Sequence, residues 1–245
     1  MIRKYMWLFI AGFFSKVLPA QFNDSVTYYT GLNSTGTYNK TNDGGELYNL
    51  NNALKLSVRK KSVSLNSSSK WVYGKQKNVL TNNDVSSALD FNLYKTLPHF
   101  YYWGLANYSS SYSLKQNHQL QGGLGIAYNF FDKPTANINI SDGLVYEYSD
   151  VILTDSTNDI YSTWRNSLRL SFRWEIKNRV FINGAGYLQN SLNYGNDFII
   201  KSDMSLGVKL RKWLSLTTSL SYNQISKTRR ENLLITYGLL IEKYF

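Results

Sequence analysis

The sequence of 245 residues contains no cysteine, and this absence excludes both disulfide bonds and thiolate metal sites. It has only 2 histidines and 3 prolines. No apolar run reaches the length of about 18 residues that a membrane-spanning helix requires, so a helical membrane bundle is excluded. Acidic residues are also few, 16 against 27 Lys and Arg, which gives a formal net charge of +11. The chain is therefore basic and has none of the features of a disulfide scaffold, a thiolate metal protein or a helical membrane protein.

The first twenty residues have the pattern of a secretory signal peptide. Arg3 and Lys4 give a positive start, residues 6–14 are apolar, and Ala20 provides a small residue for cleavage. The alternative is an uncleaved anchor, but the short apolar run cannot cross ~30 Å of hydrocarbon as a helix. We therefore expect a signal peptide at residues 1–20 and one exported domain at residues 21–245.

The composition of the exported part is polar on average but rich in aromatic residues. Aromatic side chains make up 16% of the chain, with 20 tyrosines, and the mean hydropathy is −0.34. A transmembrane β-barrel has this composition, because its strands expose only every second side chain to lipid. Export without cysteine is compatible with a protein of the bacterial outer membrane.

Apolar and polar residues alternate with a period of two along most of the chain, as in residues 214–223. A helix would repeat its apolar residues every three or four positions. The even number of segments found suits a single-chain bacterial barrel with both termini on one side. The two segments at 99–112 and 179–190 alternate poorly, and their facing is left open. The twelve predicted strands are 25–38, 47–58, 62–74, 85–95, 99–112, 118–131, 135–148, 161–174, 179–190, 197–210, 213–225 and 232–245.

The connections between these segments are short and long in strict alternation. "RKKS", "KTLP", "FDKP", "EIKN" and "RKW" are short, whereas "NKTNDGGE", "GKQKNVLTNND" and "SDVILTDSTNDIY" are longer and polar. Outer-membrane barrels have tight periplasmic turns and longer external loops. Pro98 and Pro134 fall in short turns, where no ladder donor is lost. A soluble β-sandwich would not need this asymmetry, so the sequence predicts an all-β fold, a transmembrane antiparallel up-and-down barrel of about twelve strands.

Charged residues on the strands are expected to face the lumen, because Arg or Lys facing lipid near the midplane costs ~2–4 kcal/mol. The arginines could line a narrow passive channel for small polar or anionic solutes. Alternatively, they could pair with acids and amides in a plugged polar lumen, which would make the protein structural or interacting. The number of strands does not decide between an open channel and a plugged lumen. The candidate pore-lining residues are Arg165, Arg169, Arg173, Lys201, Lys209, Lys55, Asp90, Glu147, Asp203 and Glu242.

Other partners follow from the position of the remaining charges. Most of the net positive charge falls beside the short turns, where anionic phospholipid head groups are the expected partners.

An exported barrel meets no nucleic acid. His99 lies in a short turn, and His118 has Ser111 and Ser113 nearby but no orienting group, so an enzyme is not expected. No cofactor or metal is expected, and the "GGLG" at 122–125 reads as strand glycines beside large aromatics. We expect a monomer.

The sequence also resembles a known family. "TGLNSTG", "GGLGIAYNF" and the closing "NLLITYGLLIEKYF" are similar to a bacterial family of salt-induced outer-membrane proteins, a domain of unknown function, from about Thr30 to Phe245. The resemblance implies an outer-membrane barrel and no particular substrate. The terminal Phe245 resembles the signal that such barrels show to the barrel assembly machinery, so this machinery is an expected partner through the last strand.

Overall fold

The computed structural model describes residues 28–40, 46–60, 62–97, 99–133, 135–154 and 157–244. The expected signal peptide, the two turn prolines Pro98 and Pro134, and Phe245 lie outside these ranges. Among the described residues, no helix is long and apolar enough to cross a membrane.

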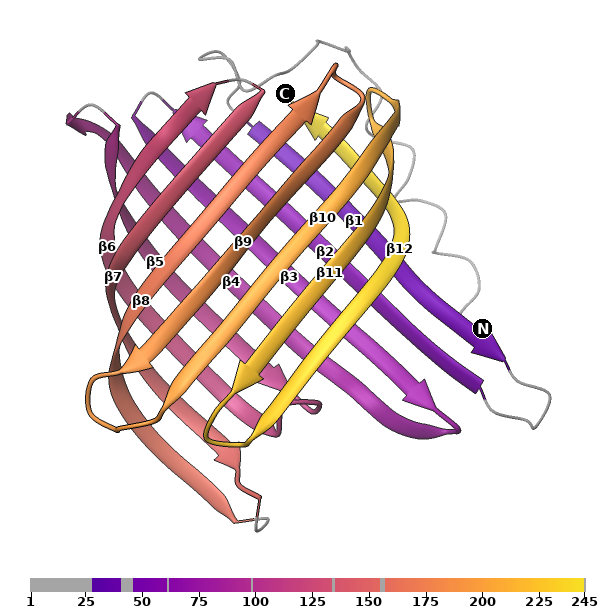
Figure 1. The fold of residues 1–245 in the computed structure, drawn as a ribbon, viewed down its shortest axis with the longest axis vertical. Coiled ribbons are helices and arrows are strands. Elements are labelled where there is room, and N and C mark those ends of the chain that lie inside the picture. Colours follow the sequence, from indigo (N-terminus) through magenta and orange to yellow (C-terminus); the bar gives the residue numbers. More distant parts are fainter. Residues whose placement is uncertain are drawn as a thin grey trace, which may run out of the picture.

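Twelve antiparallel strands form a closed barrel, as the sequence predicts (Figure 1). Each strand pairs with its neighbours in sequence, and β1 pairs with β12 to close the cylinder. The strands are β1 (Tyr28–Lys40), β2 (Glu46–Lys60), β3 (Val63–Gln76), β4 (Val79–Leu97), β5 (Phe100–Ser111), β6 (Gln116–Lys133), β7 (Ala136–Ile152), β8 (Asn158–Ile176), β9 (Val180–Ser191), β10 (Phe198–Arg211), β11 (Leu214–Ile225) and β12 (Arg230–Tyr244).

One predicted long loop is instead a tight hairpin. The polar stretch 74–84 continues β3 and β4 almost without interruption, and only Lys77 and Asn78 form the turn. Both have positive φ, 48° and 63°, which matches a two-residue turn with the twist of the flanking strands. The prediction was wrong because strand ends beyond the apolar belt have polar side chains on both faces and resemble a loop in sequence.

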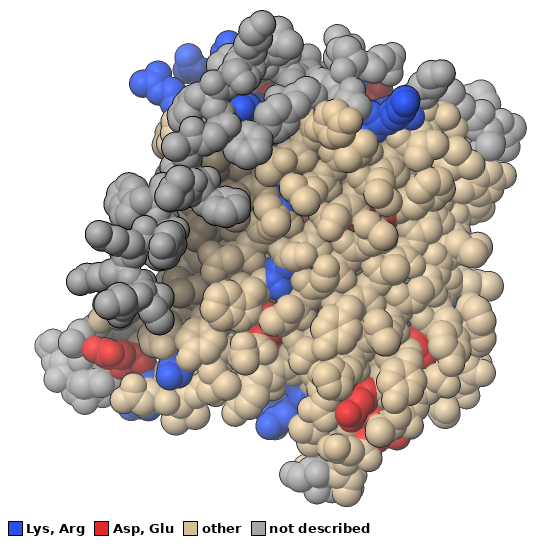
Figure 2. Space-filling view, turned by 180° about the vertical axis from the view of Figure 1, so that it is seen from behind, with Lys and Arg blue, Asp and Glu red and all other residues tan. Residues whose placement is uncertain are grey.

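The outer wall of the barrel is apolar. Leu124, Leu170 and Leu233 point outward and are 72%, 51% and 60% exposed. Figure 2 shows a largely uncharged wall, in which the larger patches of Lys, Arg, Asp and Glu lie near the two ends and a few charged atoms are visible between them. Asp142 is an exception, since it faces outward from β7 and accepts a hydrogen bond from Asn166. A closed apolar belt of this extent is unfavourable in water and is the surface that a transmembrane barrel presents to lipid.

The two strands whose facing was left open carry large aromatic residues on their inner side. Trp103 of β5 lines the interior, as do Phe181 and Tyr187 of β9. Trp103 has room because Gly125 and Gly143 are paired directly opposite each other beneath its ring. Because aromatic side chains point both inward and outward on these two strands, apolar and polar residues do not alternate simply, and the sequence pattern is weak there.

Gly125 is therefore expected to be intolerant of even one added methyl group. A Cβ there would collide with the Asp142 carbonyl oxygen and lie 2.6 Å from Trp103 Cζ2. Gly125→Ala should lower the free energy of unfolding by about 1–3 kcal/mol through overpacking. Gly186→Ala is the matched control, because a Cβ at Gly186 meets nothing within 4 Å. Urea titrations in lipid vesicles would measure both, and equal stabilities would contradict the packing argument.

Candidate functional site

Within the part of the chain that the structure describes, the lumen has a chamber toward the loops and another toward the short turns. The loop-side chamber has a volume of about 260 Å³ and the turn-side chamber about 650 Å³. Both are rich in serine, asparagine and charged side chains. The chambers meet where they share the same lining residues, which are Ser68, Lys70, Ser86, Ala88, Arg169, Asp203 and Ser221.

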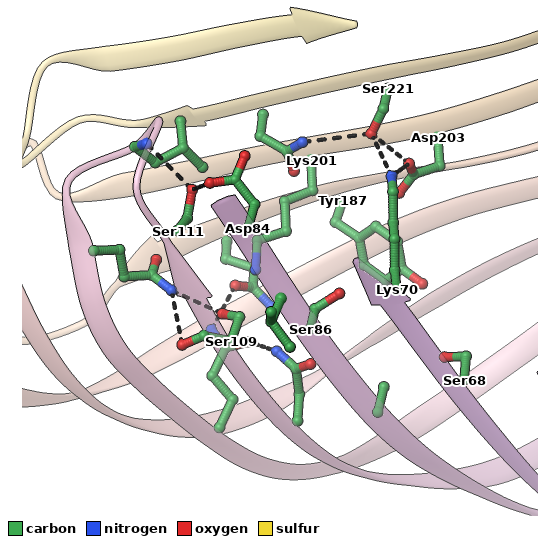
Figure 3. Close-up of a pocket in the computed structure, with 18 of the residues that line it drawn as sticks. Ser68, Lys70, Asp84, Ser86, Ser109, Ser111, Tyr187, Lys201, Asp203 and Ser221 are labelled. Carbon is green, nitrogen blue, oxygen red and sulfur yellow. Dashed lines mark hydrogen bonds and ion pairs between the residues drawn. The ribbon is translucent and has the colours of Figure 1, made fainter. Parts of the chain in front are cut away.

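A bridge across the lumen stands at this junction. Lys70 of β3 donates from Nζ to Asp203 Oδ1 of β10 at 3.1 Å and to Ser221 Oγ of β11 at 2.9 Å. Ser221 in turn donates to Asp203 at 2.6 Å. Figure 3 shows Lys70 extended toward the other two side chains. Since β2, β1 and β12 separate β3 from β11 in the ring, these contacts join distant parts of the wall.

Arg169 lines both chambers beside this bridge. Its guanidinium carbon lies 5.1 Å from the ring centroid of Tyr187, a distance at which a cation is attracted to the ring face. Arg169 Nε is buried and has no hydrogen-bond partner among the described residues. Arg169 Nε is therefore an unsatisfied buried donor beside the junction of the two chambers.

The turn-side chamber has a second charged cluster near its open end. Glu175 accepts from Arg173 Nη2 at 3.3 Å and from Lys209 Nζ at 2.5 Å. The side chain of Glu175 is buried, whereas that of Arg173 is 41% exposed. Two cations thus share one acid, and the group retains one positive charge.

Arg165 has a different environment from the two arginines that follow it on β8. It is fully buried and donates to both oxygens of Glu147, from Nε at 2.9 Å and from Nη2 at 2.8 Å. Its Nη2 also contacts Asp197 Oδ2 at 3.0 Å, in the loop between β9 and β10. Burial raises the pKa of the Asp197 carboxyl, while the Arg165 guanidinium opposes this rise.

The same cluster is completed by neutral donors from neighbouring strands. Glu147 accepts hydrogen bonds from Gln119 and Gln121 of β6 at 2.9 and 2.6 Å, and from Ser149 and Tyr161 at 2.9 and 3.1 Å. A buried ion pair is tolerated when such bonds satisfy its remaining oxygens. The Arg165 cluster therefore acts as a packed polar core that ties β6, β7, β8 and the β9–β10 loop together.

The turn between β5 and β6 is held against the loop-side chamber. Asp84 accepts from Ser111 Oγ and Ser113 Oγ, each at 2.8 Å, and Asn232 of β12 donates to Ser113 Oγ at 2.9 Å. Leu114 of this turn is buried and lines the chamber. The serines near His118 are thus engaged with Asp84, and the His118 ring lies 2.9 Å from Tyr108 Oη instead.

The sequence candidates divide into two groups in space. Arg165 and Glu147 line neither chamber, because they are buried against each other. The site also includes three residues that the sequence pattern did not identify, Lys70, Tyr187 and Asp197. Lys70 could have been identified, because it has the same inward parity as Ser68. Among the residues with described positions, no group of three or more His, Asp or Glu could hold a metal ion. The candidates that line a chamber are Lys55, Asp90, Arg169, Arg173, Lys201, Asp203, Lys209 and Glu242.

Known structures share this fold at low sequence identity. The NanC porin aligns with a TM-score of 0.54 and 10% identity, over 88% of this chain and 99% of its own. The translocator domain of the autotransporter NalP from Neisseria meningitidis gives 0.53 and 11%, over 90% and 89%. An outer-membrane channel from Pseudomonas putida F1 gives 0.50 and 11%, over 94% and 100%. No curated protein matches the sequence.

The closed even-stranded barrel and its apolar belt identify a protein of the bacterial outer membrane. This agrees with the fold that it shares with outer-membrane barrels. The model of the DUF481 family, described as proteins of unknown function, matches residues 26–238, and the chain therefore belongs to that family.

Proposed function

We propose that the protein is a narrow passive channel for small polar solutes, with a preference for anions, and that it catalyses no reaction. The observation that carries the proposal is the junction of the two chambers, which share lining residues and are spanned there by the bridge from Lys70 to Asp203. Polar side chains line the path on both sides of it. The porin and the channel with the same fold make such a role compatible with the architecture.

The preference for anions follows from the charges of the turn-side chamber. Its acids are Glu175, Asp203 and Glu242. A positive field in a narrow polar passage favours anions. Arg169 contributes at the junction itself, because this residue lines both chambers. The cations of this chamber outnumber its acids; they are Lys55, Lys70, Arg169, Arg173 and Lys209.

A second candidate function is a barrel with a closed lumen that works through its loops or stiffens the envelope. The Arg165 cluster favours this alternative locally, because it fills part of the loop-side interior with fully bonded side chains. The two functions differ in conductance. Well-folded protein in planar bilayers should give small, reproducible single-channel steps if it is a channel, and no steps from folded protein would contradict the proposal.

Ion selectivity tests the role of the arginines. The double replacement Arg169→Ala and Arg173→Ala removes two positive charges from the turn-side chamber. We expect the reversal potential in a salt gradient to shift from anion preference toward zero or cation preference. The control is Lys177→Ala with Arg179→Ala, which removes the same charge from the exposed β8–β9 turn outside both chambers. A shift of equal size in the control would assign selectivity to the rim rather than to the lumen.

A further inference from the structure

The seam between β1 and β12, which closes the barrel, is hydrogen-bonded over only part of its length. The part without ladder pairs is called the unzipped seam. The ladder between β1 and β12 runs from Tyr29↔Tyr244 to Gly36↔Tyr237 and ends there. Both strands continue beyond this point, β1 to Lys40 paired with β2 and β12 back to Arg230 paired with β11. In Figure 1 the two strands diverge from each other toward the loop end. The inner hydroxyls of Thr35 and Thr236 lie 2.7 Å apart near the end of this ladder.

The open part of the seam lies at the depth of the lipid-facing belt. Leu233 and Ile235 of β12 point outward and are 60% and 43% exposed, and Tyr38 of β1 is 67% exposed. Tyr38 is paired directly with Tyr48, in the row of aromatic residues toward the loops. Strand edges at membrane depth are unfavourable unless they are paired or border a cavity that contains polar groups. An unpaired strand edge at this depth is therefore expected only where it borders a cavity that contains polar groups.

The loop-side chamber extends to this seam. Asn232 and Leu234 of the unzipped part of β12 are among its lining residues. Leu234, Leu114 and Val72 give the chamber an apolar portion, while its serines, Lys201 and Arg169 give it a polar one. A chamber with these two portions, beside the stretch where the β1–β12 ladder is absent, suits a molecule that has a polar head and a hydrocarbon tail.

The axial exit on the loop side is narrowed at the same level. The β5–β6 turn reaches β12 through the bond from Asn232 to Ser113, and the Arg165 cluster fills the lumen between β6, β7, β8 and the β9–β10 loop. A molecule in the loop-side chamber thus meets a narrowed axial exit on the loop side and the unzipped seam to its side.

We propose that the unzipped seam between β1 and β12 is a lateral portal through which small amphiphiles, such as single-chain fatty acids, pass between the loop-side chamber and the outer leaflet. The head group occupies the chamber and the tail passes between residues 37–40 and 233–236. This route goes beyond axial conduction and does not depend on it.

Engineered cysteines test the geometry, and the cysteine-free chain allows this without background. Tyr38→Cys with Ile235→Cys places two outward residues across the open seam. Ser34→Cys with Leu239→Cys is the matched pair in the zipped part, where the two residues are directly paired. We expect oxidation to link the Ser34/Leu239 pair at least roughly tenfold faster, since a disulfide cannot form when the Cα atoms are more than ~7 Å apart. Equal rates in folded protein would overturn the portal.

A fluorescence experiment tests passage. A variant that keeps Trp103 as its single tryptophan, with phenylalanine at the others, reports from inside the loop-side chamber. Stearic acid carrying a nitroxide on its hydrocarbon chain should quench Trp103 in vesicles. A bifunctional maleimide across the 38/235 cysteine pair should reduce this quenching at least about twofold, whereas a bridge at 34/239 should not. A variant with Trp164, which faces lipid, should be quenched in every case.

Quenching of Trp103 that is unchanged by the 38/235 bridge would overturn the proposal, because the probe would then enter by another route. No quenching of Trp103, with the seam pair still slow to oxidise, would also overturn it and would assign the open edge to strand pairing with another chain.

Discussion

Replacing Arg165 by methionine is expected to lower the free energy of unfolding by about 3–5 kcal/mol, because it leaves two buried acids without their cation. Arg165 and Glu147 are fully buried and Asp197 nearly so. Methionine fills much of the space but supplies no donor for either carboxylate. The change should appear as a lower midpoint in urea titrations of the barrel in vesicles, followed by tryptophan fluorescence.

A matched control and a rescue make this expectation specific. Arg173→Met removes the same charge from the same strand, but its side chain is 41% exposed and we expect a loss of less than about 1 kcal/mol. Adding Glu147→Gln and Asp197→Asn to Arg165→Met should restore most of the stability, because no buried charge then remains unpaired. Equal midpoints for Arg165→Met and the native chain would show that the cluster does not stabilise the barrel.

The architecture could be predicted from the sequence because one physical rule acts on every strand. Lipid on one side and polar side chains on the other force a period of two, so residues such as Leu216 and Ser215 separate by face. The same rule placed Arg169 and Lys201 inward. The rule fails where the lumen is also filled by large apolar groups, as with Trp103, whose space depends on Gly125 and Gly143 from other strands.

The contacts within the lumen could not be predicted, because they join residues from strands that are distant in sequence. The bridge from Lys70 to Asp203 spans 133 positions, and its partners depend on the strand tilt and register. Asp197 lies in a loop, so no face pattern applies to it, yet it completes the Arg165 cluster. Three inward arginines at equal spacing on β8 therefore have unlike roles, since Arg165 is buried, Arg169 lies at the junction and Arg173 lies near the open end.

Removal of the bridge should have the largest effect on conduction. Lys70→Ala deletes a side chain that crosses the junction of the two chambers, so we expect single-channel conductance to rise at least about twofold, because a constriction in a pore limits its current. The bridge is partly solvent-exposed, with side-chain exposures of 28% for Lys70 and 59% for Asp203, so the fold should tolerate its loss. Planar bilayer recordings, with folding checked by heat-modifiable migration, would measure the effect.

Two further variants separate the bulk of Lys70 from its charge. Lys70→Met keeps the length of the side chain but cannot bond Asp203 or Ser221, so its conductance should lie between those of the native chain and Lys70→Ala. Asp203→Asn keeps a hydrogen-bond acceptor for Lys70 and removes one negative charge, and should therefore increase anion selectivity with little change in conductance. If Lys70→Ala conducts no more than the native chain while Asp203→Asn leaves selectivity unchanged, the junction does not control the path, and the closed polar barrel becomes the better account of the lumen.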